Sequence, residues 1–384
     1  MACFLIRGGQ RETVMRCVYG VWLLLVAIVA AEAAEPLLVM SVEPAPDWEA
    51  HFQRSGDWIG ADGNYAIRVA PDRVLWFFSD TLLGRIEAGR RVDSRMINNS
   101  IGVQTDTPTG PRLEFYHGAD DARKPVALFR PDTPTHWYWL LGGTIVEGRV
   151  HLFLWEFQKS TEPGVFGFQN VGVTHTIIEN PLELPTQWKV SRQPLPFTEI
   201  TEERRTLFGS AVMKHEGLVY IYGTRETPQV KLSPRQMLLA RVPEQTIHDH
   251  ATWEFRTESS WSTDVHRAVP LVSGIAAEYS VHHQTPENQF LVISHGDLLS
   301  PQIVARTADH PWGPWTAPRD LWKCPEPASR KGYFAYAGKA HPEISTDGEL
   351  LITYAVNSFQ FADLFQDATL YWPRFVRVKL VPTK

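Results

Sequence analysis

The sequence predicts an all-β protein, specifically a five-bladed β-propeller built from four-stranded antiparallel sheets. One pattern recurs five times: a small residue, a strand, a tight polar turn, and a strand rich in aromatic and β-branched residues. The turns centre near residues 72, 148, 217, 288 and 348, so the repeats are 60 to 76 residues long. Further strand-like segments follow the hairpins, and no helical periodicity extends over 12 residues or more. Antiparallel four-stranded units that repeat radially are the blades of a propeller.

The last repeat is short and ends near Leu380. A closed ring leaves no sheet edge exposed, so we expect residues 37–40, or a segment near them, to add a strand to that blade. Two stacked β-sandwich domains are the alternative, but they would need a linker and the sequence contains none. We therefore expect residues 34–384 to form a single domain.

The N-terminal segment is typical of a signal peptide. Three arginines precede an apolar run at residues 21–30, and small residues up to Ala33 follow it. An uncleaved anchor is less favoured, because the run is shorter than the ~20 residues that a membrane-spanning helix needs. We expect residues 1–33 to be removed and the protein to be secreted or periplasmic, with no membrane attachment afterwards.

The composition narrows the possible partners. The formal net charge is −6 and the charges of both signs are interspersed, which argues against nucleic acid as a partner. Cys3 and Cys17 precede the expected cleavage site, so only Cys324 remains and no internal disulfide is possible. We expect a monomer.

Two aspartates flank the first hairpin, whose strands surround a turn at residues 71–73. Asp62 precedes the first strand and Asp80 follows the second, so a tight hairpin places both at the same end. A single Asp in such a place more often caps a turn. Two carboxylates converging on the rim of the central funnel instead favour acid/base chemistry.

The fifth repeat begins with Lys339, His341 and Glu343 at alternating positions. In a strand these three side chains would share one face, where they would bind substrate. A buried salt-bridge network that closes the ring is the alternative.

Other polar residues near the expected funnel are candidates for substrate binding. Glu278 and His282 would share a face of the fourth repeat's first strand, and Glu278 is also a second-rank candidate acid. Arg225 follows a strand of the third repeat, in the place that Asp80 holds in the first. Asn98 and Asn99 would lie beside the strand of Asp80, where they would bind sugar hydroxyls or hold the bend.

No motif indicates a cofactor, a metal centre or a nucleophile. Histidines and carboxylates lack a dependable metal-ligand spacing, although a structural or funnel-bound cation stays open. Gly209-Ser210-Ala211 is not the Gly-x-Ser-x-Gly elbow, and no phosphate-binding or dinucleotide-binding loop is present. Carboxylates are then the converging reactive groups, and glycoside hydrolysis needs nothing more.

Two other functions remain open at this point. A glycan-binding propeller without catalytic activity would use the same carbohydrate partner. A lyase or sulfatase acting on acidic polysaccharide would need more Arg and Lys around the funnel than the sequence places there.

Five motifs carry a resemblance to a known family. They are Gly60-Ala61-Asp62-Gly63, Leu75-Trp76-Phe77-Phe78-Ser79-Asp80-Thr81, Asn98-Asn99-Ser100, the run from Tyr336 to Glu343, and Tyr354-Ala355-Val356-Asn357-Ser358. Together they resemble a bacterial family of five-bladed propellers, most of whose members are domains of unknown function. Some relatives are endo-D-arabinanases that act on mycobacterial cell-wall arabinan.

The resemblance implies an exported glycoside hydrolase whose catalytic pair is Asp62 and Asp80, because the arabinanases have two aspartates at the matching motif positions. This chain departs from the family in having Ser79 where Gly is common. Nothing in the sequence identifies arabinan, so the substrate is another furanoside, a pyranoside or an arabinan-like glycan.

Overall fold

The computed structural model describes residues 37–381, apart from residues 38, 162, 163, 165, 229–233, 285–287, 297, 298 and 347. The expected signal peptide, residues 1–33, lies outside the described residues, as do two of the expected turn residues, Glu287 and Asp347. In the described part of the chain no helix is long and apolar enough to cross a membrane.

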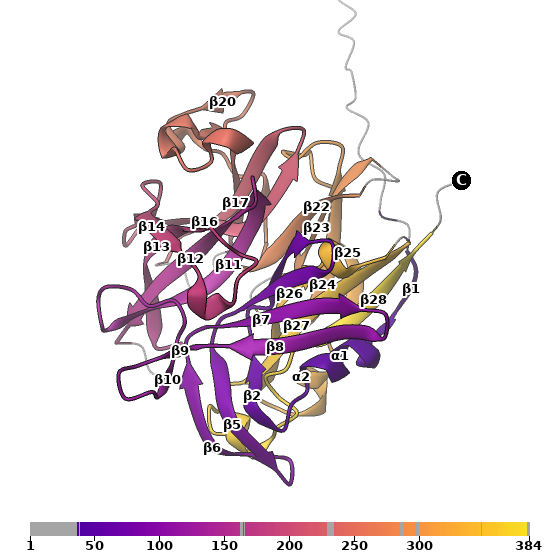
Figure 1. Cartoon of the computed structure of the whole chain (residues 1–384). Coiled ribbons are helices and arrows are strands. Elements are labelled where there is room, and N and C mark those ends of the chain that lie inside the picture. Colours follow the sequence, from indigo (N-terminus) through magenta and orange to yellow (C-terminus); the bar gives the residue numbers. More distant parts are fainter. Residues whose placement is uncertain are drawn as a thin grey trace, which may run out of the picture. The chain divides into compact units, whose positions relative to one another are not determined.

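The described strands form five antiparallel sheets of four or more strands, which follow one another along the chain (Figure 1). The first sheet contains β3 (Tyr65–Ala70), β4 (Arg73–Phe78), β7 (Ser100–Thr107) and β8 (Gly110–Tyr116). The second contains β11 (His136–Val146), β12 (Arg149–Lys159), β13 (Phe168–Ile178) and β14 (Val190–Pro194). The third contains β15 (Glu199–Ile200), β16 (Arg205–His215), β17 (Leu218–Glu226), β18 (Gln236–Pro243), β19 (Glu254–Arg256), β20 (Trp261–Ser262) and β21 (Val272–Ser273).

The fourth sheet contains β22 (Tyr279–Gln284), β23 (Gln289–His295), β24 (Gln302–Ala308) and β25 (Arg319–Lys323). The fifth contains β26 (Tyr333–Ala340), β27 (Glu349–Ser358), β28 (Arg374–Leu380) and β1 (Val39–Pro44). The helices are short: α1 (Pro46–Phe52), α2 (Glu326–Ser329), α3 (Asp363–Gln366) and 3₁₀ turns such as η5 (Pro342–Ile344). The all-β class predicted from the sequence is confirmed.

The first long strands of the five sheets surround a common axis. Strand β11 packs against β3 and β16, β16 packs against β22, and β22 packs against β26. A small cavity of about 80 Å³ is lined by residues of all five strands. Glycine lets two of these strands approach closely, since a Cβ on Gly142 would lie 2.9 Å from the carbonyl oxygen of Gly209.

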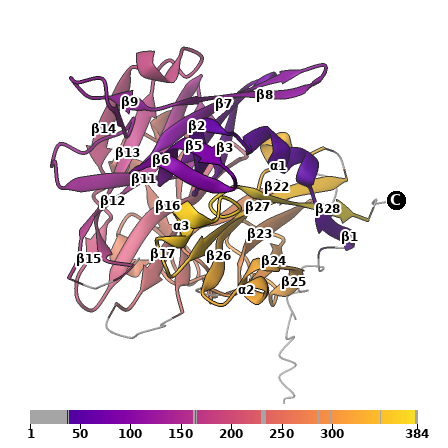
Figure 2. The ribbon, with the colours of Figure 1, turned by 90° about the horizontal axis from the view of Figure 1, so that it is seen from below.

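The N-terminal strand β1 pairs antiparallel with β28, the last strand of the chain, with Val42 opposite Val378. It becomes the outer strand of the fifth sheet, in the order β1-β28-β27-β26, and both ribbon views show the two strands side by side (Figures 1 and 2). The paired segment begins at Val39, two residues later than the expected start at Leu37.

A further three-stranded sheet, which the sequence did not predict, is formed by segments that precede β3 and that lie between β4 and β7 along the chain. It consists of β2 (Gly56–Ala61), β5 (Thr81–Glu87) and β6 (Arg90–Ile97). The chain enters the β3–β4 hairpin from β2 and leaves it into β5. The amide of Asp62 donates to the carbonyl of Asp80 over 3.2 Å, and the amide of Ser79 donates to the carbonyl of Asp62 over 2.9 Å. Asp62 and Asp80 therefore lie where the two sheets join.

Aromatic packing holds this junction against the fifth sheet. Phe52 of α1 meets the ring of Trp76 edge-on at 4.9 Å between centroids, and it lies 5.2 Å from the ring of Phe375 in β28. Phe52 and Trp76 are fully buried, and burying such a side chain contributes on the order of 2–3 kcal/mol. The indole of Trp76 donates to Gln104 over 2.9 Å, so its one polar atom is satisfied. These contacts pack α1 between β4 and β28.

Candidate active site

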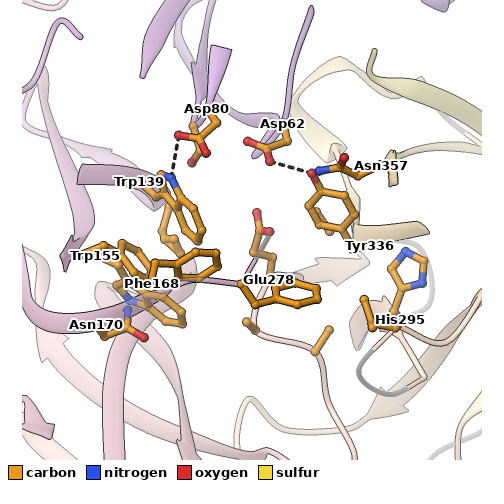
Figure 3. A pocket seen from close by; sticks show the side chains of 18 of the residues that line it. Asp62, Asp80, Trp139, Trp155, Phe168, Asn170, Glu278, His295, Tyr336 and Asn357 are labelled. Carbon is orange, nitrogen blue, oxygen red and sulfur yellow. Dashed lines mark hydrogen bonds between the residues drawn. The ribbon is translucent and has the colours of Figure 1, made fainter. Parts of the chain in front are cut away.

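A cavity of about 280 Å³ is lined by residues from the second, third, fourth and fifth sheets, by Asp62, Ser79 and Asp80 next to the ends of the first hairpin, and by other connecting segments. Three acids, Asp62, Asp80 and Glu278, form part of its wall. In Figure 3 their carboxyl groups point toward one another, between Trp139 on one side and Tyr336 on the other. The cavity therefore combines a cluster of acids with residues from several sheets.

Backbone geometry brings Asp62 and Asp80 together. Gly63 has φ +84°, and a Cβ there would lie 2.9 Å from the amide nitrogen of Ser79. Only glycine lets the segment after Asp62 pass so close to the end of β4. The neighbouring Asn64 also adopts positive φ, at 56°. This tight crossing explains why the motif around Asp62 has glycine at position 63.

Asp62 lies in an environment that favours its neutral form. Its Oδ2 accepts hydrogen bonds from Tyr336 (2.7 Å) and Tyr371 (2.9 Å), while its Oδ1 is buried and has no partner among the described residues. Burial raises the pKa of Asp62 well above its usual value, and the charges of Asp80 and Glu278 add to that rise. The two tyrosine hydrogen bonds oppose the rise without cancelling it. This environment therefore favours the protonated form of Asp62.

Asp80 is less perturbed. Burial raises its pKa to about 6, while hydrogen bonds from Asn98 and Trp139 oppose the rise because they stabilise the carboxylate. Both donors reach the same oxygen, Oδ1, over 3.0 Å. The environment of Asp80 therefore favours the ionised form more than that of Asp62 does, and acid/base catalysis requires such a division between its two carboxyl groups.

Glu278 is the third acid, and a buried lysine holds it. Its Oε1 lies 3.4 Å from Nζ of Lys339, whose side chain is 2% exposed. The same ammonium group donates to the carbonyls of Gly63 and of Ala337, and it lies 4.4 Å from the centroid of the Tyr65 ring. Burial lowers the pKa of Lys339, and Glu278 opposes this. Lys339 does not line the cavity, but its contacts link Glu278 to the backbone next to Asp62.

Aromatic side chains form much of the remaining wall. The ring of Trp139 lies 4.1 Å from that of Phe157 and 4.7 Å from that of Phe168, between centroids. At the other side Phe334 also lines the cavity, and its ring lies 6.0 Å from that of Phe166, which is 45% exposed. An apolar wall with a few convergent polar groups is typical of a ligand site.

Several residues expected to bind substrate do not line this cavity. His341 is buried and pairs with Thr353 (2.7 Å) and with Glu343 (3.1 Å). The expectation that Lys339, His341 and Glu343 share a strand face is wrong, because β26 ends at Ala340 and Glu343 belongs to η5. The three residues line the small cavity between the first long strands of the sheets instead.

The remaining expected residues also have other contacts. Arg225 donates to the carbonyl of Ala268 over 3.1 Å, and Asn99 holds the backbone of Phe129 and Tyr138. His282 is 5% exposed and also does not line the cavity. Asn98 acts on the site only through Asp80.

Sequence reasoning missed several side chains that complete the cavity. These are Trp139, Trp155, Arg205, Arg235, Tyr336 and Tyr371. Tyr336 stands inside one of the motifs of the resemblance, and Trp139 opens the second hairpin, so both had a local signal. Arg205, Arg235 and Tyr371 lie at strand ends or in connecting segments, where nothing in the sequence marks them.

Within the described residues no group of three or more His, Cys, Asp or Glu side chains is arranged to hold a metal ion.

Fold and site together define an all-β protein with a carboxylate-bearing cavity lined by residues of several sheets. The chain belongs to the family described as Domain of unknown function (DUF5005), whose model matches residues 46–380. This match confirms the resemblance that the motifs indicated. A search of curated proteins gave no match.

Several solved structures are similar to this chain. One is described as a putative hydrolase from Bacteroides ovatus ATCC 8483; it is 21% identical, with a TM-score of 0.70 over 88% of this chain and 90% of that chain. An α-L-arabinofuranosidase from Clostridium thermocellum ATCC 27405 is 10% identical, with a TM-score of 0.46 over 88% and 98%. An endo-arabinase from Bacteroides thetaiotaomicron VPI-5482 is 10% identical, with a TM-score of 0.43 over 86% and 99%.

Proposed function

We propose that the protein is a glycoside hydrolase in which Asp62 is the general acid and Asp80 the general base or nucleophile. The observation that carries the proposal is the pairing of two neighbouring carboxyl groups with different pKa values in one aromatic-walled cavity. A structural turn carboxylate would gain nothing from burial next to a second one, because burying like charges together is unfavourable.

The chemistry needs these two groups in opposite protonation states. Asp62 gives its proton to the glycosidic oxygen as the bond to the anomeric carbon breaks. Asp80 either takes a proton from the attacking water or attacks the anomeric carbon itself. The negative charge of Glu278 raises the pKa of Asp62 and stabilises the positive charge that develops on the sugar ring. The anomeric configuration of the first product, followed by NMR, decides between inversion and retention.

We also propose that the five sheets are the blades of one closed propeller, with β1 closing the ring, in a single domain of residues 34–384. Removal of the β1 segment, residues 39–44, should leave the edge of β28 exposed and lower the melting temperature strongly. The proposal includes export as a monomer, which N-terminal sequencing and sizing of the mature protein test. Mature protein that begins after Ala33 is the expected result.

The substrate class is a polysaccharide or oligosaccharide, with furanosidic, arabinan-like glycans as the first to test. The experiment is a screen of bacterial and algal polysaccharides, with release of reducing ends as the readout. Asp62→Asn and Asp80→Asn should each lower turnover on the cleaved substrate by 100-fold or more while binding persists. Asp72→Asn is the matched control, since Asp72 lies exposed at the opposite turn of the same hairpin.

Retained turnover in both Asp62→Asn and Asp80→Asn would overturn the assignment. Binding of a glycan by the unmodified protein without any cleavage would favour the glycan-binding alternative. Products with the ultraviolet absorbance of an unsaturated uronate would indicate a lyase, because β-elimination consumes no water.

A further inference from the structure

Arg205 and Arg235 also line the cavity, and the proposed acid/base chemistry uses neither of them. Arg205 and Arg235 hold one carboxylate between them, since Glu226 Oε1 lies 2.8 Å from Nη1 of Arg205 and its Oε2 lies 2.8 Å from Nε of Arg235. Two guanidinium groups on one carboxylate leave a net positive charge in the wall.

Strand register creates this arrangement. Arg205 opens β16 and is directly opposite Glu226, the last residue of β17. Arg225 is opposite Gln236, the first residue of β18, and Arg235 immediately precedes that residue. Arg205, Glu226 and Arg235 therefore form a row across adjacent strand ends of the third sheet. A row at the ends of three strands is fixed in place by the sheet's own hydrogen bonds.

The two arginines, rather than the glutamate between them, line the cavity. The side chains of Arg205 and Arg235 are 23% and 21% exposed, against 16% for Glu226, and only the two arginines line the cavity. Nε of Arg205 is buried without a partner among the described residues. An excess positive charge in a half-buried place is unfavourable until an anion joins it.

The arginine row is also linked to the acid cluster through the backbone. The carbonyl of Arg235 accepts hydrogen bonds from the amides of Gly274 (2.9 Å) and Ile275 (3.3 Å). From there the chain runs through Ala276 and Ala277, which line the cavity, to Glu278. A group bound at the arginines thus has a fixed position relative to the carboxyl groups.

We propose that Arg205 and Arg235 bind a monoanionic substituent of the glycan, the carboxylate of a uronic acid residue or a sulfate ester, near the bond that is cleaved. The planar fork of Arg matches such an oxyanion in two-point contacts. One excess positive charge suits a single negative charge better than a phosphate dianion. The inference rests on the proposed function for what happens to the bound glycan, and it narrows the substrate class to acidic glycans. An acidic substrate requires positively charged side chains at the site, and the sequence alone did not place Arg205 and Arg235 there.

The test compares binding of matched sugars to the full-length protein by ligand-observed NMR and calorimetry. Glucuronate and galacturonate are compared with glucose and galactose, and galactose 6-sulfate distinguishes sulfate from carboxylate recognition. We expect at least tenfold tighter binding of one acidic form than of its neutral parent. Arg205→Gln and Arg235→Gln should each reduce that preference about tenfold, whereas Arg225→Gln, whose side chain bonds the backbone of Ala268, should retain it.

A second variant separates recognition from a purely structural ion pair. Glu226→Gln removes the internal competitor for the arginines, so affinity for the acidic sugar should rise severalfold and should become more sensitive to salt. A structural network would lose stability in this variant without any gain in affinity. Equal binding of acidic and neutral sugars, or an unchanged preference in both arginine variants, would overturn the inference.

These readouts do not depend on turnover. Asp62→Asn should abolish cleavage and keep the preference for the acidic sugar. Preference without cleavage of any glycan would refute the proposed function alone. Cleavage of neutral glycans with no acidic preference would refute the anion subsite alone.

Discussion

The indole nitrogen of Trp139 donates a hydrogen bond to Oδ1 of Asp80 over 3.0 Å, and the amide of Asn98 donates to the same oxygen over the same distance. The two donors come from different parts of the fold, β11 and the turn between β6 and β7. Both hydrogen bonds stabilise the ionised form of Asp80, and so they hold its pKa near 6 despite burial. Among the described residues, no donor bonds the other carboxylate oxygen.

Trp139→Phe keeps an aromatic ring and removes one of these donors. A hydrogen bond to a charged group contributes about 1.5–3 kcal/mol, so the pKa of Asp80 should rise by about one to two units. The acidic limb of the pH profile for kcat/KM should move to higher pH by the same amount. Titration of the Asp80 carboxyl carbon by NMR measures the shift without any substrate.

Trp155→Phe is the matched control for this prediction. Its indole also borders the cavity but donates to the carbonyl of Phe208 over 2.9 Å, so the titration of Asp80 should not change. Equal midpoints for Asp80 in the unmodified protein and in Trp139→Phe would show that the indole does not tune this carboxylate.

Tyr371→Phe and Tyr336→Phe test the partners of Asp62. Each removes a hydrogen bond that lowers the pKa of Asp62, so that pKa should rise further. The general acid then stays protonated to higher pH, and the alkaline limb of the pH profile should move upward. We expect kcat to fall about tenfold, because the acid also loses an orienting contact worth roughly 1.4 kcal/mol.

Tyr354→Phe serves as the control for the tyrosine variants, since its hydroxyl donates to Glu326 and it does not line the cavity. Movement of the alkaline limb to lower pH in Tyr371→Phe would contradict the assignment of Asp62 as the acid.

The parts of the fold and site that depend on local sequence were predictable. Hairpins with polar turns have a local signal, and the adjacency of Asp62 and Asp80 followed from hairpin geometry alone. The β2-β5-β6 sheet was missed because its strands, residues 56–61 and 81–97, lie outside the hairpin pattern that recurs along the chain. Arg205 and Tyr371 reach the cavity only through tertiary packing, which no local pattern encodes.

The error at Glu343 had a local signal that the alternation of residues concealed. Pro342 follows His341 directly, and a proline inside a strand pattern indicates that the strand ends there. Chain direction changes at η5, so Glu343 bonds His341 instead of lying beside it on a strand face. Alternation over three residues is too short to establish a strand when proline interrupts it.

Arg91 joins the β2-β5-β6 sheet to the segment that carries Tyr371. It is 4% exposed and donates to the carbonyls of Ile59 (2.9 Å), Leu364 (2.6 Å) and Leu370 (2.5 Å). Arg91→Met leaves these buried carbonyls without their donor and should lower the free energy of unfolding by roughly 3 kcal/mol or more. Urea unfolding measures the loss, and the exposed neighbour Arg90→Met is the control. A difference below about 0.5 kcal/mol between the two variants would show that water replaces the guanidinium.

Three histidines outside the cavity predict how stability depends on pH. His151 Nδ1 lies 3.0 Å from His175 Nε2, and His175 Nδ1 lies 3.1 Å from His250 Nε2. Burial lowers the pKa of His151 to about 4 and that of His175 well below its usual value, and charges on nearby histidines lower the pKa of His175 further. The unfolded chain, with ordinary histidine pKa values near 6.5, therefore binds more protons than the folded protein below that pH.

Stability contributed by the neutral histidines should be complete above about pH 6.5 and should decline as the pH falls toward 4. His151 alone accounts for on the order of 3 kcal/mol over that interval, since one pKa unit corresponds to about 1.4 kcal/mol. His175→Gln removes the central titrating group, and its unfolding free energy should depend less steeply on pH between 6.5 and 4. Carboxylates titrate in both proteins, so the difference between the two slopes isolates the histidine contribution. Parallel slopes would mean that the buried histidines do not govern acid sensitivity.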